Sequence, residues 1–149
     1  VLFPRCLSRA HARLSLAVKY QTTKEQAEKF AEKAAEYAGY CYRQKNLSLR
    51  VIRTASELMK WSQRFSNCSH GYVENVAYGN SLLCVIVDVR KPKAAYFMLD
   101  YDVRTHSINQ CRGFHNYTSM ADDPQVETFC GQWLDYIGKK EAPQLRGVA

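Results

Sequence analysis

The sequence lacks the motifs of several common enzyme classes. Its 149 residues contain no G-x-S-x-G turn, no phosphate-binding P-loop, no dinucleotide glycine fingerprint and no H-E-x-x-H helix. His70, His106 and His115 are candidates for acid–base work by residue type alone. The sequence therefore predicts a protein that is not an enzyme and that needs no cofactor.

Paired cysteine spacings are also absent. The six cysteines occur without a C-x-x-C motif, which argues against a zinc module or a scaffold of twin disulfides. Cys41, Cys84 and Cys130 fall on predicted apolar faces, where cysteine behaves as a small hydrophobe. Cys68 and His70 form a close Cys–His pair, but two ligands do not make a metal site, so we expect no metal. No apolar run is long enough to cross a membrane.

Positive charge is concentrated at the start of the chain. The formal net charge is +7, and residues 1–19 contain Arg5, Arg9, Arg13 and Lys19 but no acidic residue. Such a segment resembles a mitochondrial import sequence, with an ordinary basic surface helix as the alternative. Arg5, Arg9 and Arg13 are expected to contact acidic partner groups or lipid phosphates. The rest of the chain is only mildly basic, so nucleic acid is not an expected partner.

Apolar periodicity predicts an α/β fold in which helices flank a small mixed or antiparallel sheet. Thr22 with Glu25, Thr23 with Gln26, and Thr54 with Glu57 have capping-box spacing at helix starts. The expected helices are 22–41, 55–65 and 124–138, and the expected strands are 72–78, 82–87, 94–101 and 106–112. The expected core residues are Phe30, Tyr37, Leu58, Trp61, Leu83, Val85, Val87, Phe97, Leu99, Phe129 and Trp133.

These elements predict one α/β domain over residues 22–138. A basic, import-like arm (1–21) precedes it, and an extended tail (139–149) with Pro143 and Gly147 follows it. Neither arm has enough apolar surface to offset the entropy of ordering its backbone, about 1–2 kcal/mol per residue. Neighbouring protein chains are therefore expected to order both arms.

Arg112 is predicted to act as a structural clamp at the end of a strand. Its guanidinium could bind Asp122 or Asp123 across the following loop, and the alternative is that it points to solvent. Asp123 can also cap the last helix, since Pro124 suits the first helical position.

Two stretches resemble class 3 lipases, the diacylglycerol-lipase type of α/β-hydrolase. AEKAAEYAGYCY (31–42) is similar to their first helix, and AAYFMLDYDVRTHSINQCRGF (94–114) is similar to their hairpin. In one register Arg112-Gly113 occupies the Arg-Gly position, with Asp122 or Asp123 downstream, and in another Gly113-Phe114 occupies a Gly-Phe position. The resemblance implies a partial α/β-hydrolase fold that lacks its catalytic half and needs a second chain to cover its sheet edge.

These observations favour a non-catalytic accessory subunit of a mitochondrial inner-membrane energy complex, such as a respiratory chain complex or ATP synthase. Its expected location is the matrix side of that membrane, and its expected partners are other subunits of the assembly, with membrane lipid as a second contact. A mitochondrial ribosomal protein is one alternative. An inactive or split lipase-like hydrolase fragment is the other.

Overall fold

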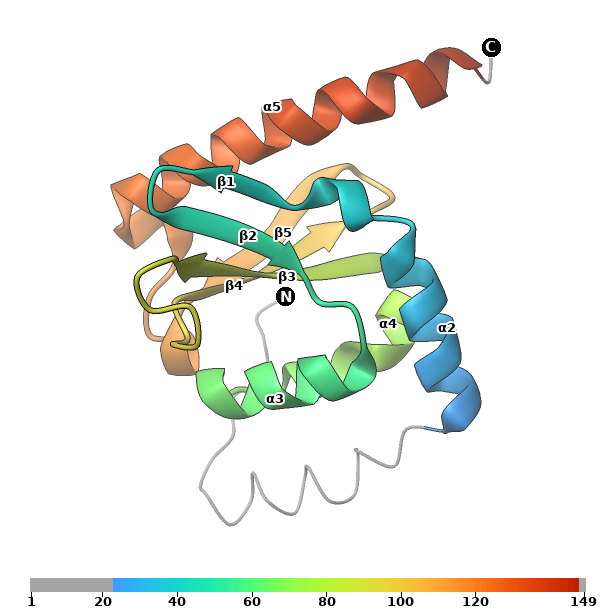
Figure 1. Ribbon diagram of the computed structural model, residues 1–149, viewed down its shortest axis with the longest axis horizontal. Coiled ribbons are helices and arrows are strands. Elements are labelled where there is room, and N and C mark those ends of the chain that lie inside the picture. The colour runs from blue at the N-terminus through green and yellow to red at the C-terminus, as the bar shows by residue number, and fades with distance from the viewer. Residues whose placement is uncertain (1–22, 148–149) are drawn as a thin grey trace.

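β3 (Ser81–Asp88) is the central strand of the fold and is covered on both faces. The computed structural model describes residues 23–147, with side chains to residue 141. Every side chain from Leu82 to Val87 is buried, as their unbroken apolar run predicts. The other elements lie on either side of this strand (Figure 1).

The sheet is antiparallel throughout, and its five strands pair in the order β1-β2-β3-β4-β5. The strands besides β3 are β1 (Tyr42–Gln44), β2 (Leu47–Val51), β4 (Phe97–Asp102) and β5 (Ser107–Arg112). The expected α/β fold class, with helices flanking a small sheet, is confirmed. β1 and β2 were not expected from the sequence, because their residues alternate over too short a span to stand out.

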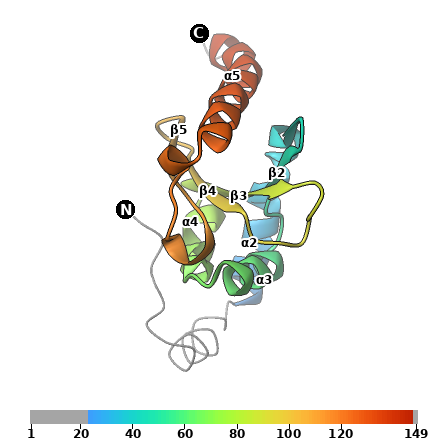
Figure 2. The same ribbon diagram turned by 90° about the vertical axis from the view of Figure 1, so that its left-hand side faces the viewer.

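Helices cover both faces of this sheet. They are α2 (Lys24–Ala35), α3 (Ala55–Phe65), α4 (Val73–Ala77) and α5 (Pro124–Gly147), with short 3₁₀ turns η1 (Ala38–Tyr40), η2 (Ser69–Tyr72), η3 (Phe114–Asn116) and η4 (Met120–Asp122). α3 lies on one face and α5 on the other, as the end-on view in Figure 2 shows. No helix within residues 23–147 is both long and apolar enough to span a membrane.

The helix starts follow the sequence signals. Thr23 forms a complete capping box with Gln26, and the Thr54 hydroxyl accepts from the Glu57 backbone N–H at 3.1 Å. The expected strand at 72–78 is wrong, because this stretch forms the end of η2 and α4. Its Val73, Val76 and Ala77 are spaced for one helix face and are all buried.

The predicted core is confirmed except at one position. Phe30, Leu58, Trp61, Phe129, Trp133 and the expected β3 and β4 residues are buried, whereas Tyr37 is half-buried. Tyr37 lies between α2 and η1, because α2 ends at Ala35 and does not continue to residue 41.

α5 does not end at Gly138, and the expected extended tail is helical as far as Gly147. Glu141 anchors this part of the helix to the sheet. Its Oε1 accepts hydrogen bonds from the Tyr40 hydroxyl (2.7 Å) and the Tyr101 hydroxyl (2.9 Å), and its Oε2 lies 2.8 Å from His106 Nδ1. Burial raises the pKa of both tyrosines, and the bonds to Glu141 raise it further. These contacts offset the weak helix propensity of Gly138.

The turn after β5 depends on Gly113. This residue is buried, and its backbone N–H donates to the Thr118 carbonyl at 2.9 Å. A Cβ atom at this position would collide with the Thr118 hydroxyl and lie 3.3 Å from the Tyr96 carbonyl oxygen. The loop is therefore closely packed, and a side chain cannot be added without a shift.

Replacing Trp133 by alanine should destabilise the fold by about 3–5 kcal/mol. The indole is fully buried, its ring meets Tyr101 edge-on at 5.3 Å, and its Nε1 donates to the Tyr40 carbonyl at 2.7 Å. Urea unfolding measures the loss. Gln132→Ala, at the exposed neighbouring position, is the control and should stay within about 0.5 kcal/mol. Equal stabilities for the two variants would show that α5 contributes little to the core.

Gly113→Ala should destabilise the protein by about 1–3 kcal/mol because of the collision with Thr118. Gly131→Ala on α5 is the matched control, since its Cβ would meet nothing within 4 Å, and it should stabilise by about 0.4–1 kcal/mol. Thermal unfolding of both variants gives the comparison. A neutral Gly113→Ala would mean that the loop adjusts freely.

Candidate functional site

Buried polar side chains within residues 23–141 come from only two stretches, 62–70 and 100–116. They are Ser62, Asn67, Ser69, His70, Asp100, Gln110 and Asn116. Burying a polar group costs free energy unless it is hydrogen-bonded, so such groups persist where they serve specificity or function. We call these seven residues the polar cluster.

The loop after α3 brings the two stretches together. Ser66 ends α3 in the left-handed conformation (φ 52°), and the chain then runs along β4 and β5. Asn67 Nδ2 lies 3.9 Å from Met98 Sδ on β4, and Gln110 Nε2 on β5 donates to the Tyr72 hydroxyl at 3.3 Å. The polar cluster therefore occupies the face of β4 and β5 that is on the same side of the sheet as α3.

Asp100 is the carboxylate of the polar cluster. It lies on β4 opposite Gln110, beside a bulge, and its side chain is only 4% exposed. Its Oδ2 accepts from Asn109 Nδ2 at 2.9 Å, whereas its Oδ1 has no hydrogen-bond partner within the described residues. Burial raises the pKa of Asp100, and the bond from Asn109 offsets part of this increase. Within the described residues, one oxygen of this buried carboxylate is therefore hydrogen-bonded and the other is not.

A cleft of about 270 Å³ opens above Asp100. It is lined by Tyr72, Asn75, Asn80, Ser81, Asp100, Asp102, Arg104 and Asn109. Asp102 is occupied by the β4–β5 turn, where it accepts from the backbone N–H groups of Arg104 (2.9 Å) and Thr105 (3.2 Å). Asp100 is therefore the carboxylate in this lining that remains able to accept a bond from a ligand.

The cleft offers a hydrogen-bond acceptor. Asp100 Oδ1 is a buried oxygen without a donor among the described residues, and so is Oε1 of Gln110, which pairs with Asp100 across the two strands. The lining contains no histidine, cysteine or lysine. Within residues 23–141, no group of three His, Cys, Asp or Glu side chains could hold a metal ion. The arrangement is suited to binding a group that donates hydrogen bonds.

The residues of the expected clamp lie close together but have other partners. Asp122 accepts from the Ser119 N–H (2.9 Å) and hydroxyl (3.2 Å), and Asp123 accepts from the Tyr96 hydroxyl (2.8 Å). Asp123 also caps α5, as expected, through the N–H groups of Gln125 and Val126. Ser119 lowers the pKa of Asp122, and the charge of Arg112 lowers it slightly more. Among residues 23–141, no ion pair joins Arg112 to either carboxylate.

The other candidate residues are dispersed. Arg5, Arg9 and Arg13 lie outside the described residues. His70 belongs to the polar cluster, His106 pairs with Glu141, and His115 Nδ1 lies 3.2 Å from the Ser66 hydroxyl. Cys84, Cys111 and Cys130 are buried free thiols. Cys41 is a free thiol as well, but it is exposed and not on an apolar face as expected.

Asp100 was not expected to be a site residue, although the sequence contains one signal. A single acidic residue interrupts the apolar run of β4, in the sequence FMLDY (97–101). A strand that is buried on both faces has no solvated side for such a residue, so its charge marks a special position.

Comparison with known proteins identifies one protein family. The family model described as PcfJ-like protein matches residues 1–126. No lipase family matches, so the resemblance to class 3 lipases is wrong. The structure agrees with this correction, because only part of residues 31–42 is helical, and the hairpin of β4 and β5 is a common motif that does not identify a family. No curated protein and no solved structure matches the chain significantly.

Asp100→Asn should raise the free energy of unfolding relative to wild type more at pH 7 than at pH 3, in the absence of ligand. The raised pKa means that folded Asp100 keeps its proton at pH values where the unfolded carboxyl has lost it. Wild-type stability therefore falls as pH rises through this window, and the variant escapes that loss. Urea unfolding from pH 3 to pH 7 measures the difference, with the exposed Asp135→Asn as control. A variant that is less stable at pH 7 would show that the fold satisfies the carboxylate.

Proposed function

The chain belongs to the PcfJ-like family, and we propose that it is a non-catalytic binding module whose cleft receives a cationic, donor-rich group. The observation that carries the proposal is the buried Asp100 carboxylate in the lining of the cleft, whose Oδ1 has no hydrogen-bond partner within the described residues. A ligand that donates to this oxygen removes an energetic cost of the fold and gains a charge-assisted hydrogen bond.

The size of the cleft limits the ligand to a small group. About 270 Å³ lies just below the usual range for sites that enclose a drug-sized molecule, roughly 300–1,000 Å³. An arginine or lysine side chain presented by a partner protein fits this space. Guanidinium is the best match, because it has five N–H donors and no acceptor.

Charged side chains of both signs lie around this end of the molecule. Glu74 on α4 accepts from Gln26 on α2 at 3.0 Å, and the glutamates of α2 are accompanied by lysines, with Lys29 3.3 Å from Glu25. Arg104 lies in the cleft lining next to Asp102, with 3.8 Å between the charged atoms. The preference for a positively charged group therefore rests on the Asp100 carboxylate in the cleft lining.

A role in recognising another protein agrees with the prediction of an accessory subunit. Binding in a small cleft needs no catalytic residues, and the partner then supplies the basic side chain. The mitochondrial location stays a prediction from the composition of residues 1–19, and the type of complex stays a prediction as well.

Methylguanidinium is the probe that tests this proposal. Titration followed by two-dimensional NMR should shift the side-chain amide signals of Asn75, Asn80 and Asn109, which line the cleft. Asp100→Asn should weaken the apparent affinity about tenfold or more, because a charge-assisted bond is worth about 1.5–3 kcal/mol. Asp135→Asn makes the same charge change at an exposed position of α5 and should leave the titration unchanged.

Tetramethylammonium separates charge from hydrogen bonding, since it is a cation without N–H groups. It should bind more weakly than methylguanidinium at the same ionic strength. Equal shifts of the amide signals with both cations, or shifts that persist in Asp100→Asn, would contradict the proposal that Asp100 recognises a hydrogen-bond donor.

A further inference from the structure

Three loops lie at the end of the molecule that faces the viewer in Figure 2. They are the β1–β2 turn, the β3–β4 loop (89–96) and the segment between β5 and α5 (113–123), and the last turn of α3 lies beside them. The Asp100 cleft is at the opposite end of β4 and β5, so it does not include these loops. We call this surface the loop end.

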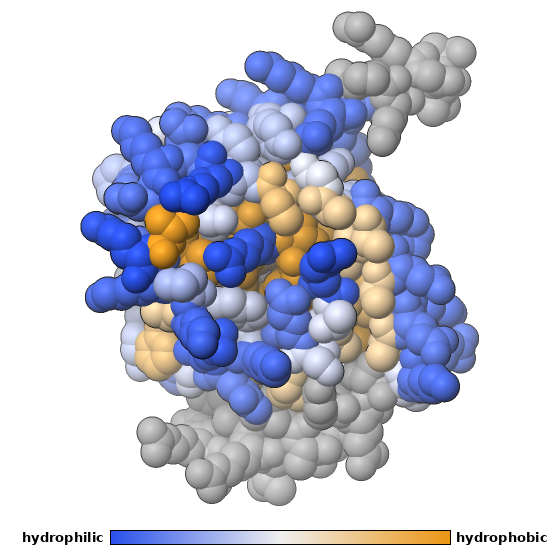
Figure 3. All heavy atoms as spheres, viewed as in Figure 1, coloured by the Kyte–Doolittle hydropathy of each residue, from blue (hydrophilic) through white to orange (hydrophobic). Residues whose placement is uncertain are grey.

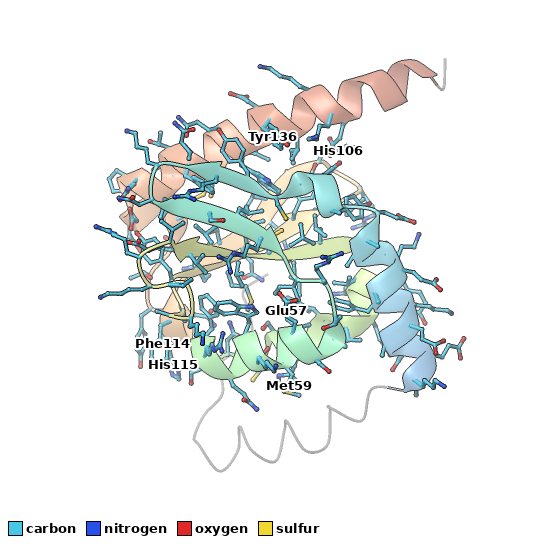
Figure 4. The ribbon with its side chains drawn as sticks, in the orientation of Figure 1. Glu57, Met59, His106, Phe114, His115 and Tyr136 are labelled. Carbon is cyan, nitrogen blue, oxygen red and sulfur yellow. The ribbon has the colours of Figure 1, made fainter. Side chains whose placement is uncertain are left out.

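Aromatic rings are exposed on the loop end. Phe114 is 52% exposed and Tyr117 is 68% exposed, and the His115 ring lies between them, with centroid distances of 5.9 Å and 4.9 Å. Figure 4 shows Phe114 and His115 beside the end of α3. Within residues 23–141, the large hydrophobic side chains that are exposed are Phe114, Tyr117 and Tyr78, and Tyr78 lies on the far side.

The backbone holds these rings in place. His115 and Asn116 both have positive φ angles (55° and 60°), which cost energy in residues other than glycine. Gly113 closes the loop onto Thr118, and the His115 ring is fixed by Ser66 at 3.2 Å. The rings are therefore presented on a preorganised support, so binding a flat partner does not require the loop to be ordered first.

Positive side chains also lie on the loop end. Arg90, Lys91 and Lys93 are exposed on the β3–β4 loop, and the same loop reaches Gly113 through the Tyr96 carbonyl. Asp88 binds Arg90 at 2.6 Å, whereas Lys91 and Lys93 extend beyond this pair. Figure 3 shows mainly hydrophilic side chains at this left-hand end.

Two further cations lie on the same end of the molecule. Arg64 lies over the Trp61 ring at 4.9 Å on the last turn of α3, and Lys45 is exposed in the β1–β2 turn. The nearby Asp122 and Asp123 are directed to Ser119, Tyr96 and the start of α5. The loop end therefore combines exposed rings with a positive rim.

We propose that the loop end binds single-stranded nucleic acid. Bases stack on Phe114 and Tyr117, and the phosphates contact Lys91, Lys93 and their basic neighbours. A lipid surface fits less well, because the exposed apolar groups are rings without accompanying aliphatic side chains. This proposal departs from the expectation that nucleic acid is no partner, because the fold joins cations at 90–93 to rings at 114–117.

Fluorescence anisotropy with labelled oligo(dT) tests the proposal. Phe114→Leu combined with Tyr117→Leu keeps apolar side chains but removes the rings, and it should weaken binding about tenfold or more. Lys91→Ala with Lys93→Ala should weaken binding and reduce the salt slope by about one to two between roughly 50 and 200 mM salt. Tyr78→Ala removes an equally exposed tyrosine (69%) on the far side and should change nothing.

Two further measurements separate stacking from simple charge attraction and from lipid binding. Duplex DNA of the same length should compete poorly, because its bases are not free to stack. The proposal is overturned if the ring variant binds oligo(dT) as well as wild type, or if duplex competes equally. It is also overturned if only vesicles of phosphatidylcholine with phosphatidylserine respond to the ring substitutions. Circular dichroism of each variant confirms that the fold is retained.

Discussion

The burial of β3 on both faces is the constraint on which the rest of the structure depends. A strand without a solvated face needs a layer on each side, so α5 covers one side of the sheet and α3 and α4 cover the other. The hairpin of β4 and β5 continues the sheet on one edge, and β1 and β2 continue it on the other. The apolar area buried in these layers is the main stabilising term of the fold.

The helix-side layer covers β4 and β5 with a loop that carries polar side chains. Ser66–Tyr72 is too irregular to bury an apolar stripe, and Asn67 and Tyr72 place polar atoms against the sheet, while Ser69 donates to Asn67 within the loop. Asp100 and Gln110 face this loop and complete the polar cluster. The same layer that closes the core thus creates a small region of low dielectric in which one carboxylate is incompletely satisfied, and that is where binding specificity can be obtained.

Sequence patterns predicted the elements whose signals are local. The apolar run of β3, the capping residues Thr23, Thr54 and Asp123, and the α/β class all depend on neighbours along the chain. The site depends on long-range pairing, since Tyr72 meets Gln110 and Ser66 meets His115 only after folding. Glu141 shows the same limit at the other end of the chain, because its contacts with Tyr40 and Tyr101 carry α5 past Gly138. The lipase resemblance failed for the converse reason: an alanine-rich helix and a hairpin are common local patterns and do not determine topology.

Charge is separated along the length of β4 and β5, and this separation follows from the direction of the strands. Because the sheet is a meander, the loops that join β1 to β2 and β3 to β4 lie at one end, with the segment that follows β5. These loops carry Lys45, Lys91 and Lys93, whereas the cleft at the opposite end is lined by Asp100 and Asp102 together with Arg104. A net charge alone cannot reveal such a division, since the positive and negative groups partly cancel in the sum. A chain divided in this way can engage a basic group at one end and a polyanion at the other, because the two surfaces share the rigid hairpin but no side chain.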